Sequence, residues 1–381
     1  MKRLIIFLSF TFIFASAAAA QPEQIASVAH FVHKINSTHL GEERTVIVRV
    51  PFAYRGSSTA KFPVVYMLDA HPPQNAMMVG IIEQQAWGGM MPEMIVVGIQ
   101  NTNRTRDLTP TKTGVPGSGG GAKFLDFVEH EVIPLVDKNY RTEPFRIFAG
   151  HSYGGLTAVY ALATRPDMFN AYIAASPLMH WDDELPVKLF EKAFKERKEW
   201  NKTLFAGLGD EPGYIDSFNK FRDLLKKAGP KGFEYELEHF KDENHGSVVL
   251  PAYYAGLRKV FAGWVPPARG SFADLEDHYK KLTARFGYKI DIPEETMNRI
   301  GYQFLANGRT AEAIEAFRRN TASYPESANT YDSLAEAYEK SGDLKRAAEN
   351  YEKAYKMAEK HGETRLAATA KANFDRVSKK N

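Results

Sequence analysis

A serine stands between two glycines in the stretch GHSYG, residues 150–154. The apolar run FRIFAG precedes it, and GGLTAVYALAT, with the apolar spacing of a helix, follows without a break. A strand that turns sharply into a helix at G-x-S-x-G is the pattern of a nucleophile elbow, in which small residues leave room for a strained turn. The turn would expose Ser152 at a helix N-terminus, where the helix dipole favours negative charge. The pattern therefore predicts that Ser152 is a nucleophile.

A serine hydroxyl needs a base to accept its proton, and in this architecture an acid and then a histidine follow the serine along the chain. The stretch TLFAGLGDEPGY supplies Asp210 and Glu211 at the end of an apolar run, and ENHGSVVL supplies His245 beyond the last apolar run. His245 is preferred to His239, which is in phase with strand apolar residues, and to His180, which precedes the acid. The choice between Asp210 and Glu211 stays open at this point.

Acyl transfer also needs N–H donors for the oxyanion of the tetrahedral intermediate. In nucleophile-elbow enzymes one donor is the backbone N–H of the residue after the nucleophile, and the other comes from the loop after the third strand. The first position is Tyr153. The second falls in the turn LDAHPP, where Ala70 or His71 would donate.

Motifs for metals and cofactors do not accompany these residues. His71 and His151 lack the helical His-x-x-His or Glu-x-x-His spacing of metal sites. The glycine-rich stretch GVPGSGGGAKF ends in Lys123 without the preceding glycine and following hydroxyl of a phosphate-binding loop. We therefore predict no metal and no cofactor.

The elements that would position these residues are short apolar runs, which alternate with amphipathic stretches between residues 44 and 241. This alternation predicts a mostly parallel sheet with helices on both faces. The predicted strands are residues 45–50, 62–69, 94–99, 145–150, 171–176, 203–209 and 233–240. Arg104 and Arg106 follow the strand 94–99, whose carboxyl end opens on the same edge as the elbow, and there they would hold an anionic or oxygen-rich substrate. Two surface charges are the alternative.

The first 20 residues have the pattern of a secretory signal peptide: Lys2 and Arg3 precede an apolar run, and small residues that include Ala18, Ala19 and Ala20 end the segment. We expect cleavage before Gln21 and a periplasmic or secreted mature protein. Its formal charge falls from +3 to +1, because 47 basic residues remain against 46 acidic ones. This balance gives no electrostatic reason to expect nucleic-acid binding, and no later segment reaches membrane-spanning length. The absence of cysteine excludes disulfides and cysteine nucleophiles.

After Pro266 and Pro267 the sequence becomes charged, alanine-rich and helix-periodic, so we predict one domain at residues 21–266 and a helical domain at 267–381. A shift of 34 residues superposes small and large apolar positions, for example Gly301 on Ala335. This period and spacing resemble two tetratricopeptide repeats; an unrelated pair of helical hairpins is the alternative. Two repeats are fewer than the roughly three needed for stability. We expect support from the flanking helices 272–286 and 364–379, with the first domain as a further support.

Taken together, the motifs resemble the putative-esterase family of α/β-hydrolases, which includes esterase D, feruloyl esterases and enterochelin (trilactone siderophore) esterases. The resemblance covers about residues 35–265. It implies that Ser152 is the nucleophile, His245 the general base, and Glu211 the acid, because Glu211-Pro212 looks like the acid-bearing turn of siderophore esterases. The motifs that carry the likeness are FPVVYMLDAH, VVGIQNTNRTRDLTPT, FLDFVEHEVIPLVDKNYRTEPFRIFAGHSYGGL, AASPLMHW and ENHGSVVLPAYYAGLRKVF.

The resemblance also implies that Asn101, Arg104 and Arg106 border the substrate pocket, with Trp181 and Tyr153 as aromatic contacts. The chain departs from the family pattern at Ala70, where relatives commonly have glycine, and in its helical tail. Some family members act without the acid.

We therefore expect an α/β-hydrolase fold followed by a small all-α domain of helical repeats. The expected activity is that of a serine carboxylic-ester hydrolase that forms an acyl-enzyme, with a siderophore lactone or another small ester as substrate. Two alternatives stay open: an acyltransferase of the same fold, and a partner-binding protein in which the repeats carry the function. The repeats themselves suggest a protein partner or a homodimer contact.

Overall fold

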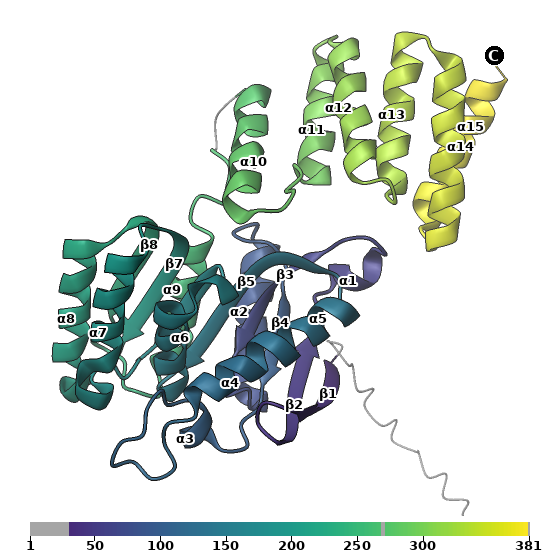
Figure 1. Cartoon of the computed structure of the whole chain (residues 1–381). Helices are drawn as coiled ribbons and strands as arrows, with labels where there is room; N and C mark the ends of the chain where they lie inside the picture. Colours follow the sequence, from purple (N-terminus) through teal and green to yellow (C-terminus); the bar gives the residue numbers. More distant parts are fainter. Residues whose placement is uncertain (1–29, 268–270, 380–381) are drawn as a thin grey trace, which may run out of the picture.

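The computed structural model describes residues 30–267 and 271–379 and consists of an α/β unit followed by a row of helices (Figure 1). The predicted signal peptide, residues 1–20, lies outside the described residues. No helix in the described part of the chain combines the length and the apolar character needed to cross a membrane.

Within the described residues, eight strands form one sheet in the order β1-β2-β4-β3-β5-β6-β7-β8. The pairs β1/β2 and β2/β4 are antiparallel, and every other neighbouring pair is parallel. The prediction of a mostly parallel sheet is thereby confirmed. The strands are β1 (His30–Ser37), β2 (Glu42–Arg49), β3 (Phe62–Met67), β4 (Ile95–Ile99), β5 (Thr142–His151), β6 (Ala171–Ala175), β7 (Glu199–Leu208) and β8 (Lys231–His239).

Strand β1 was not among the predicted strands, whereas each of the other seven lies within a few residues of a predicted one. It is an edge strand in which Phe31 and Val32 are exposed and only Ser37 is buried. Because such a strand buries little surface, it has no continuous apolar run to reveal it.

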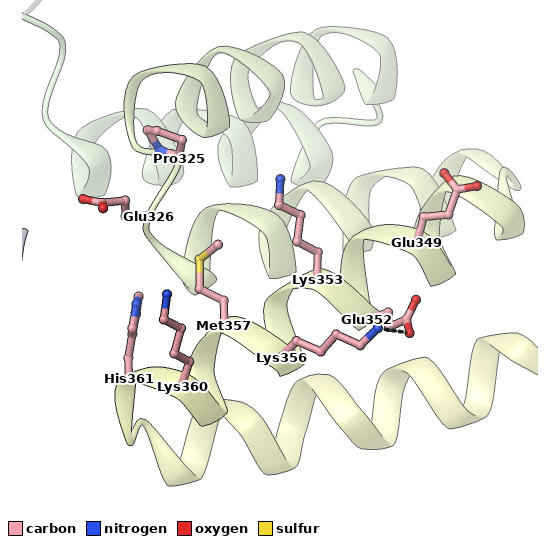
Figure 2. A pocket seen from close by; sticks show the side chains of 9 residues that line it. All are labelled: Pro325, Glu326, Glu349, Glu352, Lys353, Lys356, Met357, Lys360 and His361. Carbon is pink, nitrogen blue, oxygen red and sulfur yellow. Dashed lines mark hydrogen bonds and ion pairs between the residues drawn. The ribbon is translucent and has the colours of Figure 1, made fainter. Parts of the chain in front are cut away.

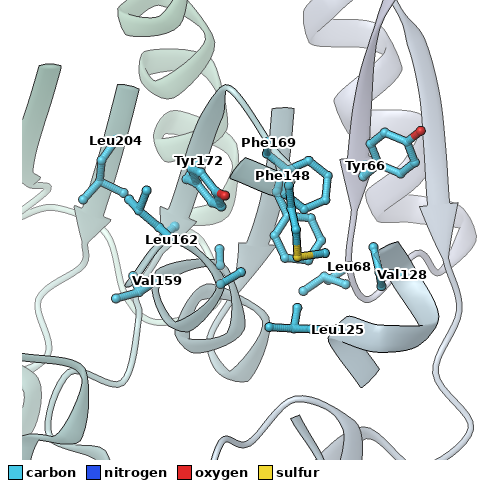
Figure 3. Close-up of a cluster of buried hydrophobic side chains, with 14 of the residues drawn as sticks. Tyr66, Leu68, Leu125, Val128, Phe148, Val159, Leu162, Phe169, Tyr172 and Leu204 are labelled. Atoms are coloured by element: carbon cyan, nitrogen blue, oxygen red, sulfur yellow. The ribbon is translucent and has the colours of Figure 1, made fainter. Parts of the chain in front are cut away.

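Helices cover both faces of the sheet, as predicted, and successive residues of a strand face different cores. In β3, Val64 and Tyr66 belong to one core, and Val65 and Met67 to the other. Figure 3 shows part of the first core around Tyr66. That core lies under α4 (Gly121–Phe127), the π-helical turn η1 (Val128–Val132), α5 (Ile133–Asn139), α6 (Tyr153–Thr164), α7 (Trp181–Glu196) and α8 (Pro212–Ala228); the second lies under α2 (Pro72–Trp87), α9 (Val249–Val260) and α10 (Phe272–Phe286). The short helices α1 (Ala53–Gly56), α3 (Arg104–Asp107) and η2 (Pro166–Met168) complete the unit.

Helix α10 packs with the α/β unit although the sequence placed it in the helical domain. The ring of Phe286 lies 4.9 Å from that of Phe145 and 5.3 Å from that of Phe261, measured between centroids. Tyr279 and Leu282 of the same helix also belong to the second core. In packing terms, the α/β unit therefore ends after α10, beyond the boundary predicted at Pro266.

The remaining helices form two antiparallel pairs and a final helix along the tail (Figure 1). A Cβ at Gly301 would overlap the ring of Phe317, so the small residue that the 34-residue shift singled out lies where the first pair crosses. As expected, a flanking helix supports the repeats, because α15 packs along α14. The bounds are α11 (Glu294–Ala306), α12 (Thr310–Ser323), α13 (Ala328–Ser341), α14 (Leu344–His361) and α15 (Thr364–Ser378).

The tail meets the α/β unit at the amino-terminal end of the parallel strands. Phe145 lies early in β5 and contacts Phe286 at the end of α10, the helix from which the chain continues into the tail. Glu326 of the tail accepts hydrogen bonds from Ser57 at 3.0 Å and Thr59 at 3.2 Å, in the loop that leads into β3. The tail therefore lies at the edge of the sheet where these strands begin.

Candidate active site

Ser152 occupies a strained turn between β5 and α6, with φ 61° and ψ −119°. A Cβ at Gly150 would overlap the carbonyl oxygen of Gly154, and a Cβ at Gly154 would lie 3.1 Å from a carboxylate oxygen of Asp69. The Ser152 N–H donates to the carbonyl oxygen of Ala175 at 2.9 Å, which ties the turn to the end of β6. The turn thus has the backbone that a nucleophile elbow requires, and the two glycines are needed for it.

Glu211 and His245 form a close pair at the same edge of the sheet. A carboxylate oxygen of Glu211, Oε2, lies 2.5 Å from Nδ1 of His245. The Glu211 side chain is only 9% exposed, whereas His245 is 39% exposed. Asp210, the other candidate acid, is exposed. Of the two acids that the sequence left open, Glu211 is the one in contact with the histidine.

His151 brings the His245 loop to the elbow. Its Nε2 lies 2.6 Å from the carbonyl oxygen of His245, and the two imidazole rings are 4.7 Å apart. Because a carbonyl can only accept, Nε2 of His151 carries the proton. Burial, and then the nearby His245, lower the pKa of His151 below its usual range. A neutral His151 therefore holds the loop of His245 at the elbow.

The hydroxyl of Ser152 has no hydrogen-bond partner among the residues that the structure describes, and the loop of His245 is joined to the elbow through His151, the residue before the serine. Hydrogen bonds between a nucleophile and its base are often long in the free enzyme and shorten when substrate binds. The arrangement leaves both the serine hydroxyl and Nε2 of His245 available to a substrate.

The two predicted oxyanion donors differ in the structure. Tyr153 is the first residue of α6, where a backbone N–H has no carbonyl partner within the helix, so it is available to an oxyanion. The N–H of Ala70, in contrast, donates to the carbonyl oxygen of Ile99 at 3.2 Å, which contradicts its predicted role. The N–H of His71 faces the carbonyl oxygen of Asp69 at 2.7 Å. The turn after β3 folds back on itself and on β4, and this pairing uses the N–H groups.

Asn101 and Arg104 do lie beside the elbow, where Asp69 holds both. Arg104 donates two hydrogen bonds to the Asp69 carboxylate, at 2.7 and 2.8 Å, and one to the carbonyl oxygen of His151 at 3.2 Å. The amide of Asn101 donates to the same carboxylate. The Arg104 guanidinium also lies 5.2 Å over the ring of Tyr153. Asp69 was not among the residues predicted from the sequence, where its only signal was a carboxylate at the end of a predicted strand.

Arg106 is used differently from what the sequence suggested. Its guanidinium donates to Glu42 and to Asp107, both at 2.7 Å, and buried Asp107 is also paired with buried Arg44 at 2.5 Å. The hydrogen bond from Arg106 is the main cause that lowers the pKa of Glu42 to about 2. This network ties α3 to β2 and occupies the Arg106 guanidinium, so the structure explains this residue as structural instead of substrate-binding.

Aromatic side chains lie near the elbow and near His245. The rings of Tyr153 and Trp181 meet edge to face at 5.6 Å, and Tyr214 lies 5.6 Å from His245. Trp181 is only 5% exposed, and its indole N–H donates to a threonine hydroxyl, so it offers a substrate little surface. Tyr214 was not singled out from the sequence; it lies in the first turn of α8, three residues after Glu211.

The tail has a pocket of its own, of about 470 Å³, along α14 (Figure 2). Lysines and glutamates line it, and Lys356 is paired there with Glu352. Ser152 is not among its lining residues. In the described residues, no group of three or more histidine, aspartate and glutamate side chains has an arrangement that could hold a metal ion.

Comparison with known families matches both parts of the chain. Residues 37–210 match the family model described as "Putative esterase", and residues 328–361 match a tetratricopeptide-repeat model. The second match covers α13 and α14, the second of the two predicted repeats.

Two individual relatives are named as esterases, and one similar solved structure is described as a serine hydrolase. The ferri-bacillibactin esterase BesA of Bacillus subtilis is 28% identical over 248 residues, which cover 57% of this chain and 85% of that protein. The siderophore triacetylfusarinine C esterase of Aspergillus fumigatus is 33% identical over 181 residues, 42% of this chain and 59% of that one. Among solved structures, an IroE-like serine hydrolase from Shewanella oneidensis matches with a TM-score of 0.69 and 28% identity, over 77% of this chain and 99% of that one.

Proposed function

Because the chain belongs to the putative-esterase family of ester hydrolases and carries a tetratricopeptide-like tail, we propose that it cleaves esters through Ser152, His245 and Glu211 by way of an acyl-enzyme. One observation carries the proposal: the 2.5 Å contact between Glu211 and Nδ1 of His245, whose loop is held at the elbow that carries Ser152. A carboxylate on Nδ1 fixes the tautomer in which Nε2 is free to accept a proton.

In the proposed mechanism, Nε2 of His245 takes the proton of Ser152 as the hydroxyl oxygen attacks the ester carbonyl carbon. The carbonyl oxygen becomes an oxyanion that accepts a hydrogen bond from the N–H of Tyr153. When the intermediate collapses, the bond to the alcohol breaks and the alcohol leaves with the proton from Nε2. Glu211 stays ionised and stabilises the imidazolium.

Deacylation repeats these steps with water. His245 takes a proton from the water, the resulting hydroxide attacks the acyl carbon, and a second oxyanion forms at the same position. Its collapse breaks the bond to Ser152, whose oxygen recovers the proton from Nε2. The carboxylic acid is released and the enzyme returns to its starting state.

We propose a siderophore ester, such as a cyclic trilactone, as the substrate class. Two relatives are named for the hydrolysis of siderophores, and this chain matches 85% of the length of one of them. Residues 1–20 further lead us to propose export to the periplasm. Mass spectrometry of protein recovered from a periplasmic extract should find Gln21 at its N-terminus; an intact Met1 would contradict export with cleavage.

A fluorophosphonate label followed by an ester panel tests the proposed chemistry. The label should modify Ser152 in the wild-type protein and in the control variant Ser341→Ala, whose serine lies in the tail, but not in Ser152→Ala. Ser152→Ala should also lose turnover of p-nitrophenyl esters and of a trilactone siderophore. Retained turnover in a folded Ser152→Ala protein would refute the nucleophile, and transfer of the acyl group to an added alcohol in preference to water would identify an acyltransferase.

A further inference from the structure

We propose that Ser176 is a positioning residue of the esterase site, which holds the carboxylate of Glu211 so that one oxygen faces His245. The inference rests on the proposed triad. Nothing in the sequence analysis singled out Ser176, which ended the predicted strand 171–176.

The hydrogen bonds of Glu211 are divided between its two carboxylate oxygens. Oε2 faces His245, while Oε1 accepts a hydrogen bond from the Ser176 hydroxyl and a second, at 3.2 Å, from the backbone N–H of Gly209. Ser176 is fully buried, so water cannot replace its hydroxyl. The terminal torsion of a glutamate is broad and has no strong preference of its own. These two donors are therefore what keeps Oε2 directed at the histidine.

The backbone of Ser176 is itself strained: its φ is 41°, in a region that residues other than glycine rarely occupy. Its N–H donates to the carbonyl oxygen of Gly207 at 2.6 Å. The preceding residue, Ala175, accepts the hydrogen bond from the N–H of Ser152. Strained backbone at a functional site persists when the surrounding contacts hold it in place.

Two adjacent residues at the end of β6 thus contact two parts of the proposed triad, the nucleophile turn and the acid. The carbonyl of Ala175 holds the nucleophile turn, and the side chain of Ser176 holds the acid. We infer that this strand end sets the position of the acid relative to the elbow. A glycine at position 176 would suit the backbone better than serine does, so the backbone does not account for a serine there, whereas its hydroxyl contacts Glu211.

Two substitutions separate the effect of the Ser176 hydroxyl from the effect of the strained backbone. Ser176→Ala removes the hydroxyl and keeps the strain, whereas Ser176→Gly removes the hydroxyl and relieves the strain. If the hydroxyl positions Glu211, both variants should lower kcat roughly 10- to 100-fold, the size expected for a lost hydrogen bond to a charged group, with KM nearly unchanged. If Ser176 merely shapes the turn, Ser176→Gly should keep wild-type kcat, and this result would overturn the inference.

A double-mutant cycle with Glu211→Ala completes the test. Glu211→Ala alone should lower kcat by roughly 10³- to 10⁴-fold. Adding Ser176→Ala to Glu211→Ala should cause no further loss, because the hydroxyl would have no carboxylate left to hold. Full additivity would overturn the inference while leaving the triad intact. A Glu211→Ala protein with wild-type kcat would instead refute the acid of the proposed triad, so the two failures are distinguishable.

Discussion

Phe286, at the end of α10, belongs to the core of the α/β unit, and its replacement by alanine should destabilise that unit. The side chain is 2% exposed and packs against the rings of Phe145, Phe261 and Trp264. Truncation of a buried phenylalanine in such a cluster costs about 3–5 kcal/mol. Since each kcal/mol corresponds to about 2–4 °C in a unit of this size, the midpoint of unfolding should fall by roughly 6–20 °C.

The matched control is Phe272→Ala at the other end of the same helix. Phe272 is partly buried, and its ring lies 6.1 Å from that of Phe304 in the tail. Residual esterase activity after heating reports the state of the α/β unit, and circular dichroism reports the whole chain. Phe286→Ala should lose activity at a lower temperature than the wild type, and Phe272→Ala should not. Equal inactivation temperatures for the wild type and Phe286→Ala would refute the assignment of α10 to the α/β core.

Three further results are expected. Gly150→Ala should abolish activity and lower stability, because the added Cβ would overlap the carbonyl oxygen of Gly154; an active, stable variant in a p-nitrophenyl ester assay would contradict the elbow geometry. Burial, and then the charge of Glu336, raise the pKa of Asp332 to about 6, above its unfolded value, so ionisation destabilises the fold as pH rises through 4–6. Asp332→Asn should therefore be more stable by about 1–2 kcal/mol at pH 7.5 in urea, and should lose this advantage at pH 4. Since the pKa of His151 is lowered on folding, the free energy of unfolding of the wild type should fall as pH drops below about 6.5, and that of His151→Gln should fall less. If urea unfolding gave the two proteins the same dependence of this free energy on pH, the result would contradict the prediction.

The elements that the sequence predicted are those whose signal is local. Six inner strands read as apolar runs, the edge strand β8 alternates apolar and polar residues, and the elbow combines a strand, a glycine-flanked serine and a helix within 20 residues. The edge strand β1 escaped because exposed strands carry no such run. The 34-residue period predicted the helix pairs of the tail, but not that α10 packs its Phe286 on residues more than 20 positions earlier in the chain.

At the site, residue types predicted the candidates, and long-range contacts decided among them. Asp210 and Glu211 are neighbours with the same chemistry, and only the folded loop shows which one meets His245. Ala70 was predicted as a donor from its place in the loop after the third strand, but the pairing of its N–H with β4 depends on strand order, which the sequence does not specify. Ser176 contacts a carboxylate 35 residues later in the chain, and no local pattern marks such a contact.

The helical tail and the catalytic edge occupy opposite ends of the parallel strands. Glu326 of the tail contacts the loop that leads into β3, whereas Ser152 follows the end of β5 and Glu211 follows the end of β7. A protein anchored through its repeats would present its esterase site away from the anchor. Immobilisation would then raise the local concentration of enzyme without obstructing diffusion of esters to the serine.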